Sequence, residues 1–259
     1  MSRHLYILLA FSMLFTTTYA EGETEAELAT AAQNPLASMI SLPFQNNTTF
    51  GGMGGDYINS LNIQPVYPVS LSEDWNLITR PVLPVLSMPV NGDQQFGLGD
   101  TTFTGWFSPT APVNNITWGV GPVAYLPTAT RTALGTDQWG GGLSAVGVWI
   151  DGPWVAGALA NNVWGFENSG RLNNFLFQYF VNYNLDAGWY LVSAPIMTAN
   201  WNASSSNRWT VPLGGGVGKI FKVGKQPMNL NGQFYYNIIK PDNYGHWTFR
   251  LQLQFMFPK

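Results

Sequence analysis

The sequence contains no cysteine and only two histidines, His4 and His246. Without cysteine, a disulfide framework and a thiolate metal site are both excluded. Only His246 lies outside the first 20 residues, which excludes most histidine-dependent metal sites and disfavours a Ser-His hydrolase. We therefore predict no metal and no cofactor.

Charged residues are also scarce. Asp, Glu, Lys and Arg make up 10% of the chain, against about 25% in an average soluble protein. Four of the 14 acidic residues lie between Glu21 and Glu27, and one of the 11 basic residues is Arg3, so the remaining ten of each sign cancel. No basic stripe is left for nucleic acid, and we predict no nucleic-acid partner.

Long hydrophobic runs are confined to the start of the chain. Arg3, the mostly apolar run 5–15 and the small-residue site 18–20 predict an export signal over residues 1–20, with the mature chain starting at Glu21. A helix that spans a membrane needs roughly 20 apolar residues. No later stretch reaches that length without Gly, Pro or polar interruption, which excludes a helical membrane protein and leaves strands as the way to cross.

The final stretch, residues 247–257, alternates between apolar and polar side chains up to Phe255. Successive side chains of a strand point to opposite faces. One face therefore carries Trp247, Phe249, Leu251, Leu253, Phe255 and Phe257, and the other carries Thr248, Arg250, Gln252 and Gln254. A soluble sandwich strand would normally show Lys and Glu on its wet face, whereas apolar-out and polar-in alternation is typical of membrane barrels. The stretch also resembles the C-terminal targeting strand of bacterial outer-membrane barrels, with Pro258 and Lys259 following it.

From residue 40 onward the chain divides into similar runs separated by turn signals. The twelve predicted strands are 40–50, 57–70, 75–88, 97–108, 116–126, 139–150, 154–165, 173–185, 189–201, 209–220, 228–239 and 246–257. An even number lets an antiparallel barrel close with both termini on one side. We predict an all-β fold, a closed antiparallel transmembrane β-barrel of about 12 strands over residues 40–259.

The connections fit the same arrangement, in which short periplasmic turns alternate with longer external loops. The expected turns are 72–74, 108–115, 151–153, 186–188 and 221–227, and the expected loops are 51–56, 89–96, 127–138, 167–172, 202–208 and 240–245. Tryptophans gather at run ends, as in aromatic girdles at a membrane interface, with ordinary core tryptophan as the alternative. They are Trp75, Trp149, Trp154, Trp189, Trp201 and Trp209.

Prolines inside the predicted strands oppose a regular ladder, because proline has no N–H to donate. They are Pro43, Pro65, Pro68, Pro81, Pro84, Pro122, Pro195 and Pro212. We expect bulges or kinks at these positions, and with them a lateral gap in the wall.

Residues 21–39 precede the barrel as an arm. Residues 21–37 are the only segment with helical composition, acidic at its start and rich in alanine. Two alternatives are open, a solvated periplasmic arm or a short helix that folds back to plug or gate the pore.

Several stretches resemble a family of outer-membrane barrels associated with meta-pathway phenol degradation, whose members are often labelled "transporter" or "neuromedin U". The stretches are 34–37, 42–47, 61–66, 74–80, 96–100, 118–122, 126–130, 214–219 and 257–259. The resemblance covers nearly the whole mature chain and implies a barrel that passes small hydrophobic or aromatic compounds. Tyr179, after Gln178, stands where the family pattern has proline.

Strand parity predicts which side chains line the lumen and set its selectivity. They are Asn62, Gln64, Asn76, Arg80, Asp100, Gln178, Asn182, Asn229, Asn231, Gln233, Tyr235, Asn237, Arg250, Gln252 and Gln254. Most are neutral amides. The few inward charges, on Arg80, Arg250 and Asp100, either pair with one another or form a constriction that selects solutes.

Two motifs for other chemistry fail. Residues 214–219 superficially resemble a phosphate-binding loop, but Leu213 stands where that motif needs glycine and Ile220 where it needs Ser or Thr. An outer-membrane phospholipase, also a twelve-stranded barrel, needs a serine beside a base, and His246 has no serine near it in sequence.

We therefore predict a monomeric outer-membrane channel for small solutes, and not an enzyme. Its partners would be outer-membrane lipid, a small-molecule solute and, during insertion, the barrel-assembly machinery. The alternative is a non-conducting structural or adhesive barrel that acts through its external loops.

Overall fold

A computed structural model describes residues 24–52, 57–167 and 172–258; the predicted export signal and parts of the predicted loops 51–56 and 167–172 lie outside these ranges. None of the helices in them is long and apolar enough to cross a membrane. The elements are α1 Glu25–Gln33, β1 Ile40–Phe50, β2 Ile58–Ile63, β3 Tyr67–Ser70, β4 Trp75–Val90, β5 Asp93–Leu98, β6 Thr101–Pro109, β7 Ile116–Leu126, η2 Thr132–Leu134, β8 Gly140–Asp151, β9 Trp154–Gly165, β10 Asn173–Asn184, η3 Asp186–Gly188, β11 Trp189–Ser193, β12 Ile196–Asn200, η4 Ser205–Asn207, β13 Trp209–Val223, β14 Gln226–Ile239 and β15 Trp247–Phe257.

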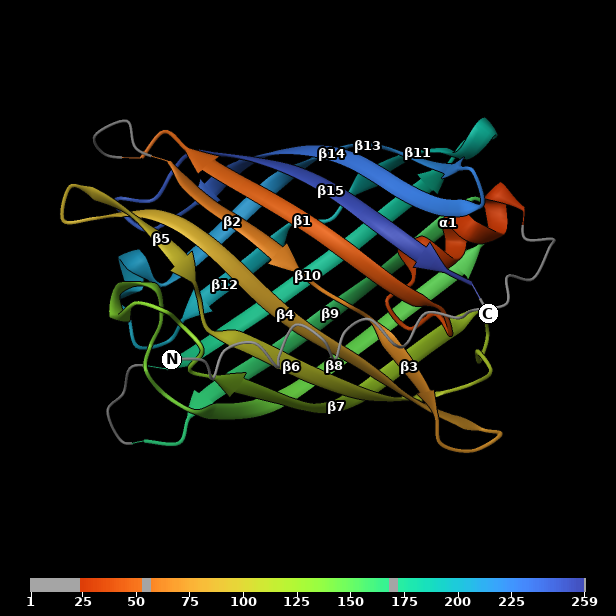
Figure 1. The fold of residues 1–259 in the computed structure, drawn as a ribbon, viewed down its shortest axis with the longest axis horizontal. Coiled ribbons are helices and arrows are strands. Elements are labelled where there is room, and N and C mark those ends of the chain that lie inside the picture. The colour runs from red at the N-terminus through yellow and green to blue at the C-terminus, as the bar shows by residue number, and fades with distance from the viewer. Residues whose placement is uncertain (1–23, 53–56, 168–171, 259) are drawn as a thin grey trace, which may run out of the picture.

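The strands form one antiparallel sheet that closes on itself (Figure 1). The first and last strands, β1 and β15, pair along their whole length, from Ile40–Phe257 to Phe50–Trp247. Three wall strands consist of two pieces each, β2 with β3, β5 with β6, and β11 with β12. Counted in this way the wall has twelve strands, and the predicted closed antiparallel β-barrel is confirmed.

Two of the three breaks coincide with predicted proline positions. Pro65 separates β2 from β3, and Pro195 separates β11 from β12, because a proline removes a ladder hydrogen bond. Pro212 lies at a register shift between β13 and β14. At Pro43 the expected irregularity is present on one edge only: the register of β1 with β15 continues unbroken, whereas the ladder of β1 with β2 stops at Phe44. Pro68 and Pro81 also lie within continuous pairings.

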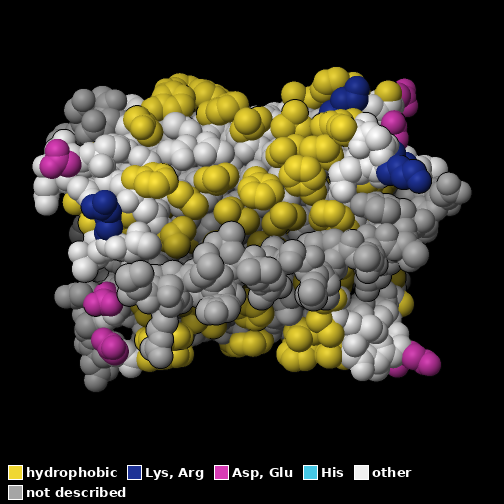
Figure 2. Space-filling model, in the orientation of Figure 1, with side chains coloured by type: hydrophobic (Ala, Val, Ile, Leu, Met, Phe, Trp, Pro, Cys, Tyr) yellow, Lys and Arg dark blue, Asp and Glu magenta, His cyan; other side chains and the backbone are white. Residues whose placement is uncertain are grey.

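The alternation predicted for residues 247–257 is present in the barrel. Phe249 and Leu251 are exposed on the outer surface, while Arg250 and Gln254 are buried in the lumen. Figure 2 shows apolar side chains over the visible wall, with the charged side chains at its two ends. Exposed tryptophans include Trp75, Trp118, Trp139, Trp149, Trp154, Trp164, Trp189, Trp201 and Trp247. Trp106 differs from them because its side chain is fully buried inside the barrel.

The two ends of the barrel differ. We call the end that holds α1 and the β8–β9, β10–β11 and β13–β14 turns the arm end, and the opposite end the loop end (Figure 1). Two predicted connections are shorter than expected. Residues 89–96 were expected as a loop, but β4 and β5 are joined by Asn91 and Gly92, with φ of 54° and 89°. Such a two-residue turn matches the twist of its strands, so pairing continues to the tip. Likewise β13 and β14 are joined by residues 224–225 alone.

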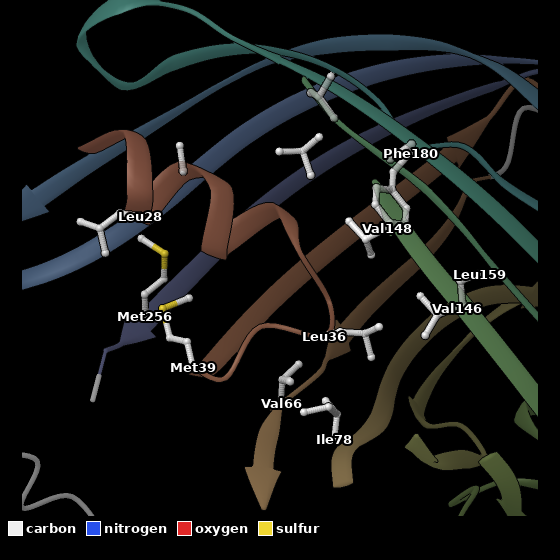
Figure 3. Close-up of a cluster of buried hydrophobic side chains, with 14 of the residues drawn as sticks. Leu28, Leu36, Met39, Val66, Ile78, Val146, Val148, Leu159, Phe180 and Met256 are labelled. Atoms are coloured by element: carbon white, nitrogen blue, oxygen red, sulfur yellow. The ribbon is translucent and has the colours of Figure 1, made fainter. Parts of the chain in front are cut away.

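The arm folds back into the barrel. Helix α1 begins with a capping box, in which Thr24 and Glu27 bond each other's backbone N–H groups, satisfying two amides that a helix start leaves free. Leu28 and Ala29 are buried, and with Leu36 they join an apolar cluster inside the arm end (Figure 3). The first turn of α1 is exposed while Leu28 and Ala29 pack inside the barrel, and a role of the arm as plug or gate remains a prediction.

Candidate functional site

The lumen contains a chamber of about 150 Å³ beside the arm. It is bounded on one side by residues of the arm that follow the buried turn of α1, among them Ala31, Gln33, Pro35 and Met39. The remaining lining comes from strands on nearly every side of the barrel. The lumen is therefore neither a wide water-filled pore nor packed solid.

One side of the chamber is lined by amides. Strands β14 and β15 are paired so that Asn229 faces Gln254 and Asn231 faces Gln252. Asn229 Nδ2 donates to Gln254 Oε1 at 3.1 Å. Gln233 Nε2 donates to Asn231 Oδ1 at 2.8 Å. These mutual bonds hold the amides in fixed positions, since a buried polar group without a partner is costly.

The side of the chamber formed by β9, β10 and β11 combines apolar and amide side chains. Leu159 of β9, Phe180 of β10 and Val192 of β11 line it, and all three belong to the cluster under the arm (Figure 3). Gln178 and Asn182 line the same side, from the same strand as Phe180. The signal for Phe180 was available in strand parity, because it lies between Gln178 and Asn182 on the face of β10 predicted to line the lumen.

Arg250 is held in the chamber by a break in the wall. Its Nη1 donates to the carbonyl oxygen of Ala194 at 2.7 Å, and its Nε donates to Asn47 Oδ1 at 2.8 Å. Ala194 lies between β11 and β12, where Pro195 interrupts the ladder and leaves this carbonyl free to accept. The guanidinium also lies over the ring of Tyr235, 5.1 Å from its centroid.

Arg80 enters the chamber from β4. Its guanidinium lies 4.9 Å from the centroid of the Trp106 ring, a distance at which a cation is attracted to the ring face. Trp106 is fixed in turn by a bond of 2.9 Å from its Nε1 to Ser144 Oγ. The buried Nε of Arg80 has no hydrogen-bond partner.

Asp100 does not neutralise either arginine. Its carboxylate accepts from the backbone N–H groups of Ala129 at 3.1 Å and Thr136 at 2.6 Å, and from the hydroxyl of Tyr125 at 3.0 Å. Among the residues that the structure describes, neither Arg80 nor Arg250 forms an ion pair with a carboxylate. The expected pairing is wrong because the break between β5 and β6 turns Asp100 toward residues 127–138.

The structure divides the predicted lumen residues into two groups. The chamber brings together Gln64, Arg80, Gln178, Asn182, Asn229, Asn231, Gln233, Arg250, Gln252 and Gln254. Outside its lining lie Asn62, bonded to Ser60, Asn76, bonded to Ser38, and Asn237, bonded to Gly245, together with Tyr235 and Asp100. Their role in selectivity remains a prediction. Parity missed Gln45, which lines the chamber from β1.

The wall is interrupted beside this chamber. β3 pairs with β4 on one edge, and the bridge between Val66 and Ser41 joins the chain to β1 just before β3 begins. Within the described ranges, the other edge of β3 has no backbone partner in the sheet. Ser41, Gln64 and Val66 all line the chamber, so the interruption lies next to it.

His246 is placed away from the chamber. Its ring stacks on Tyr236, with 6.1 Å between centroids, in the connection between β14 and β15 at the loop end. In the described part of the chain its imidazole bonds no serine. No group of three His, Asp or Glu side chains suited to a metal occurs there either.

Comparison with known proteins finds no matching family and no matching curated protein. Similar solved structures exist. The COG4313 outer membrane channel from Pseudomonas putida F1 superposes with a TM-score of 0.63 at 18% identity, over 85% of this chain and 94% of that one. The two chains share a barrel fold. The outer membrane phospholipase of Salmonella typhi gives 0.47 at 13%, over 92% and 99%, and the P. putida toluene transporter TodX gives 0.41 at 10%, over 92% and 93%.

The capping box predicts a small pH dependence of the arm. The bonds from Thr24 lower the pKa of Glu27, so the cap is intact at pH values above the ordinary pKa of glutamate and is lost as pH falls through the lowered one. Because the carboxylate is fully exposed, the effect is small. The protection factors of the arm amides, which correct for the intrinsic pH dependence of hydrogen exchange, should fall slightly on acidification in the wild type. Glu27→Gln keeps a capping side chain without the titration, and should remove that part of the change; an equal change in both proteins would contradict the prediction.

Proposed function

We propose that this protein is an outer-membrane channel for small solutes. The observation that carries the proposal is the chamber, because the lumen of a barrel with a purely structural role would be filled by side chains. Hydrophobic or aromatic compounds are the favoured class, on the resemblance of the sequence to the phenol-degradation barrels. The apolar side chains of Leu159, Phe180 and Val192 in the chamber lining support that class.

The outer surface supports a place in the membrane. An apolar wall with tryptophans toward its ends and charges at the two ends is what lipid and its interfaces favour. Lys219 extends along the outer surface over the Trp189 ring, at 4.7 Å from its centroid, as a side chain reaching the interface does. We place the arm end on the periplasmic side and take the protein to be a monomer.

A route through the molecule is proposed on the same grounds. The solute would enter from the loop end, reach the chamber, and leave either past the arm or sideways through the interruption between β3 and β1. The sideways exit suits apolar compounds, since it opens toward lipid rather than water. It accounts for the broken ladder at Pro65, which otherwise weakens the barrel without benefit.

One observation favours the alternative, a non-conducting barrel. The apolar cluster of Leu28, Leu36, Met39 and the wall beneath them fills much of the arm end. In that reading the arm is a permanent part of the core, and the loops make the useful contacts.

Liposome swelling separates the two functions. Proteoliposomes that contain the mature protein should admit solutes about the size of benzene, since a cavity of roughly 150 Å³ in another protein accommodates that molecule. We expect glycine and glycerol to enter and sucrose to be excluded. A barrel that is folded, as judged by its heat-dependent gel mobility, but passes none of the three would reject the channel and support the alternative.

A further inference from the structure

We propose that the chamber holds a binding site for a small organic anion, a single aromatic ring that carries a carboxylate, with Arg80 and Arg250 as its cationic contacts. This inference rests on the proposed function and names the chemical class that the same chamber binds. Its basis, within the residues that the structure describes, is that one cavity contains cations without a carboxylate partner, hydrogen-bond donors without an acceptor, and several apolar side chains.

The lining of the chamber carries positive charge that no carboxylate of the described lining neutralises. Arg80 and Arg250 both line the chamber, and none of the described residues that line it is Asp or Glu. The carboxylate that the sequence predicted as their partner, Asp100, accepts hydrogen bonds from Ala129, Thr136 and Tyr125 instead. Uncompensated buried charge is expensive, so the chamber favours any small anion that can enter.

The chamber also has hydrogen-bond donors that lack an acceptor among the described residues. Two buried donors at the chamber have no partner, Arg80 Nε and Gln45 Nε2. Unsatisfied buried polar atoms are rare and call for a missing partner. Carboxylate oxygens accept several bonds and pair with guanidinium groups in a planar, two-pronged geometry. Arg250 contributes less freely, because Asn47 and Ala194 already hold two of its donors.

The apolar side chains and the volume of the chamber limit the shape of the ligand. Leu159, Phe180 and Val192 supply an apolar surface in the same chamber, and the volume of about 150 Å³ suits one six-membered ring. A ligand that matches both the charge and the apolar side chains must therefore be apolar over most of its surface and anionic at one end. Inorganic anions and acetate satisfy the charge but leave the apolar side chains without a contact.

Calorimetric titration of the purified mature protein tests this with three probes at equal ionic strength: sodium benzoate, benzyl alcohol and sodium acetate. Benzoate should bind at least about tenfold more tightly than either of the others, since hydrogen bonds to a charged group and burial of a ring each contribute on that scale. Equal affinity for benzoate and benzyl alcohol would overturn the anion site. Equal affinity for benzoate and acetate, or no benzoate binding at millimolar concentration, would overturn the class of ligand proposed.

Variants assign the site to residues. Arg80→Gln should weaken benzoate binding about tenfold and leave benzyl alcohol unchanged, whereas Arg80→Lys should retain part of the affinity because it keeps the charge but not the planar fork. Arg131→Gln is the matched control, because Arg131 bonds Gln95 and Phe96 at the loop end, outside the chamber. Undiminished binding in folded Arg80→Gln would overturn the assignment; should that variant not fold, Arg80→Lys and the three-probe comparison decide.

The same samples separate this inference from the proposed function. Benzoate bound selectively by a barrel that passes no solute would uphold the anion site and reject the channel. Flux of glycine through a barrel that shows no preference for benzoate would do the reverse.

Discussion

Removing residues 24–37 should raise the single-channel conductance on the order of tenfold, because a twelve-stranded barrel without an inner segment is wider than the eight-stranded barrels that side chains fill. The arm contributes both the helix at the arm end and one side of the chamber. Without it the narrowest section of the lumen disappears. Planar bilayer recordings of the deleted and complete proteins give the ratio directly.

A reversible lock provides the matched control. Gln33 Nε2 donates to Asn184 Oδ1 of β10 at 2.8 Å, so these two positions lie side by side when the arm is inserted. The chain has no native cysteine, and Gln33→Cys with Asn184→Cys can be joined by a short bifunctional thiol reagent. The locked protein should keep the low conductance, and each single variant should ignore the reagent. Equal conductance with and without the arm would show that the arm does not narrow the path.

Trp106→Ala should be the most destabilising single substitution in the lumen. Its side chain is fully buried, bonds Ser144 and carries the guanidinium of Arg80 on its ring. Emptying such a site costs about 3–5 kcal/mol, and the loss should appear as a lower urea midpoint for the barrel refolded in lipid vesicles.

Two further variants divide that loss. Ser144→Ala removes only the partner of the indole N–H, and should lower the free energy of unfolding by about 1–3 kcal/mol. Trp118→Ala removes an exposed ring on the outer surface, packed edge-on against Trp75, and leaves the lumen intact. If Trp118→Ala destabilised the barrel more than Trp106→Ala, the lumen would not contain the core that the structure shows.

The sequence predicts the outer face of the barrel wall more clearly than the contacts inside the lumen. Alternation fixes which face each side chain of β15 occupies, because a strand has a period of two, and the apolar face of residues 247–257 follows from that alone. It does not say which residues meet across the barrel. Arg80, Arg250 and Asp100 share a predicted face, yet Asp100 bonds Thr136 and Tyr125.

One apolar side chain of the chamber was hidden for a related reason. Leu159 lies in a strand with few polar residues, which reads as lipid contact until the arm is known to fold inside. The partners Leu28 and Leu36 come from a segment whose composition suits a solvated helix equally well. Tertiary contact, and not local pattern, decides between them.

The most direct test of the central claim, that solutes pass through the chamber, uses one introduced thiol. Gln252 lines the chamber, and the preceding residue, Leu251, faces outward on the same strand. Gln252→Cys labelled with a bulky methanethiosulfonate reagent should lose most of its glycine flux and regain it on reduction, while labelled Leu251→Cys keeps its flux. Undiminished flux through fully labelled Gln252→Cys would contradict the account.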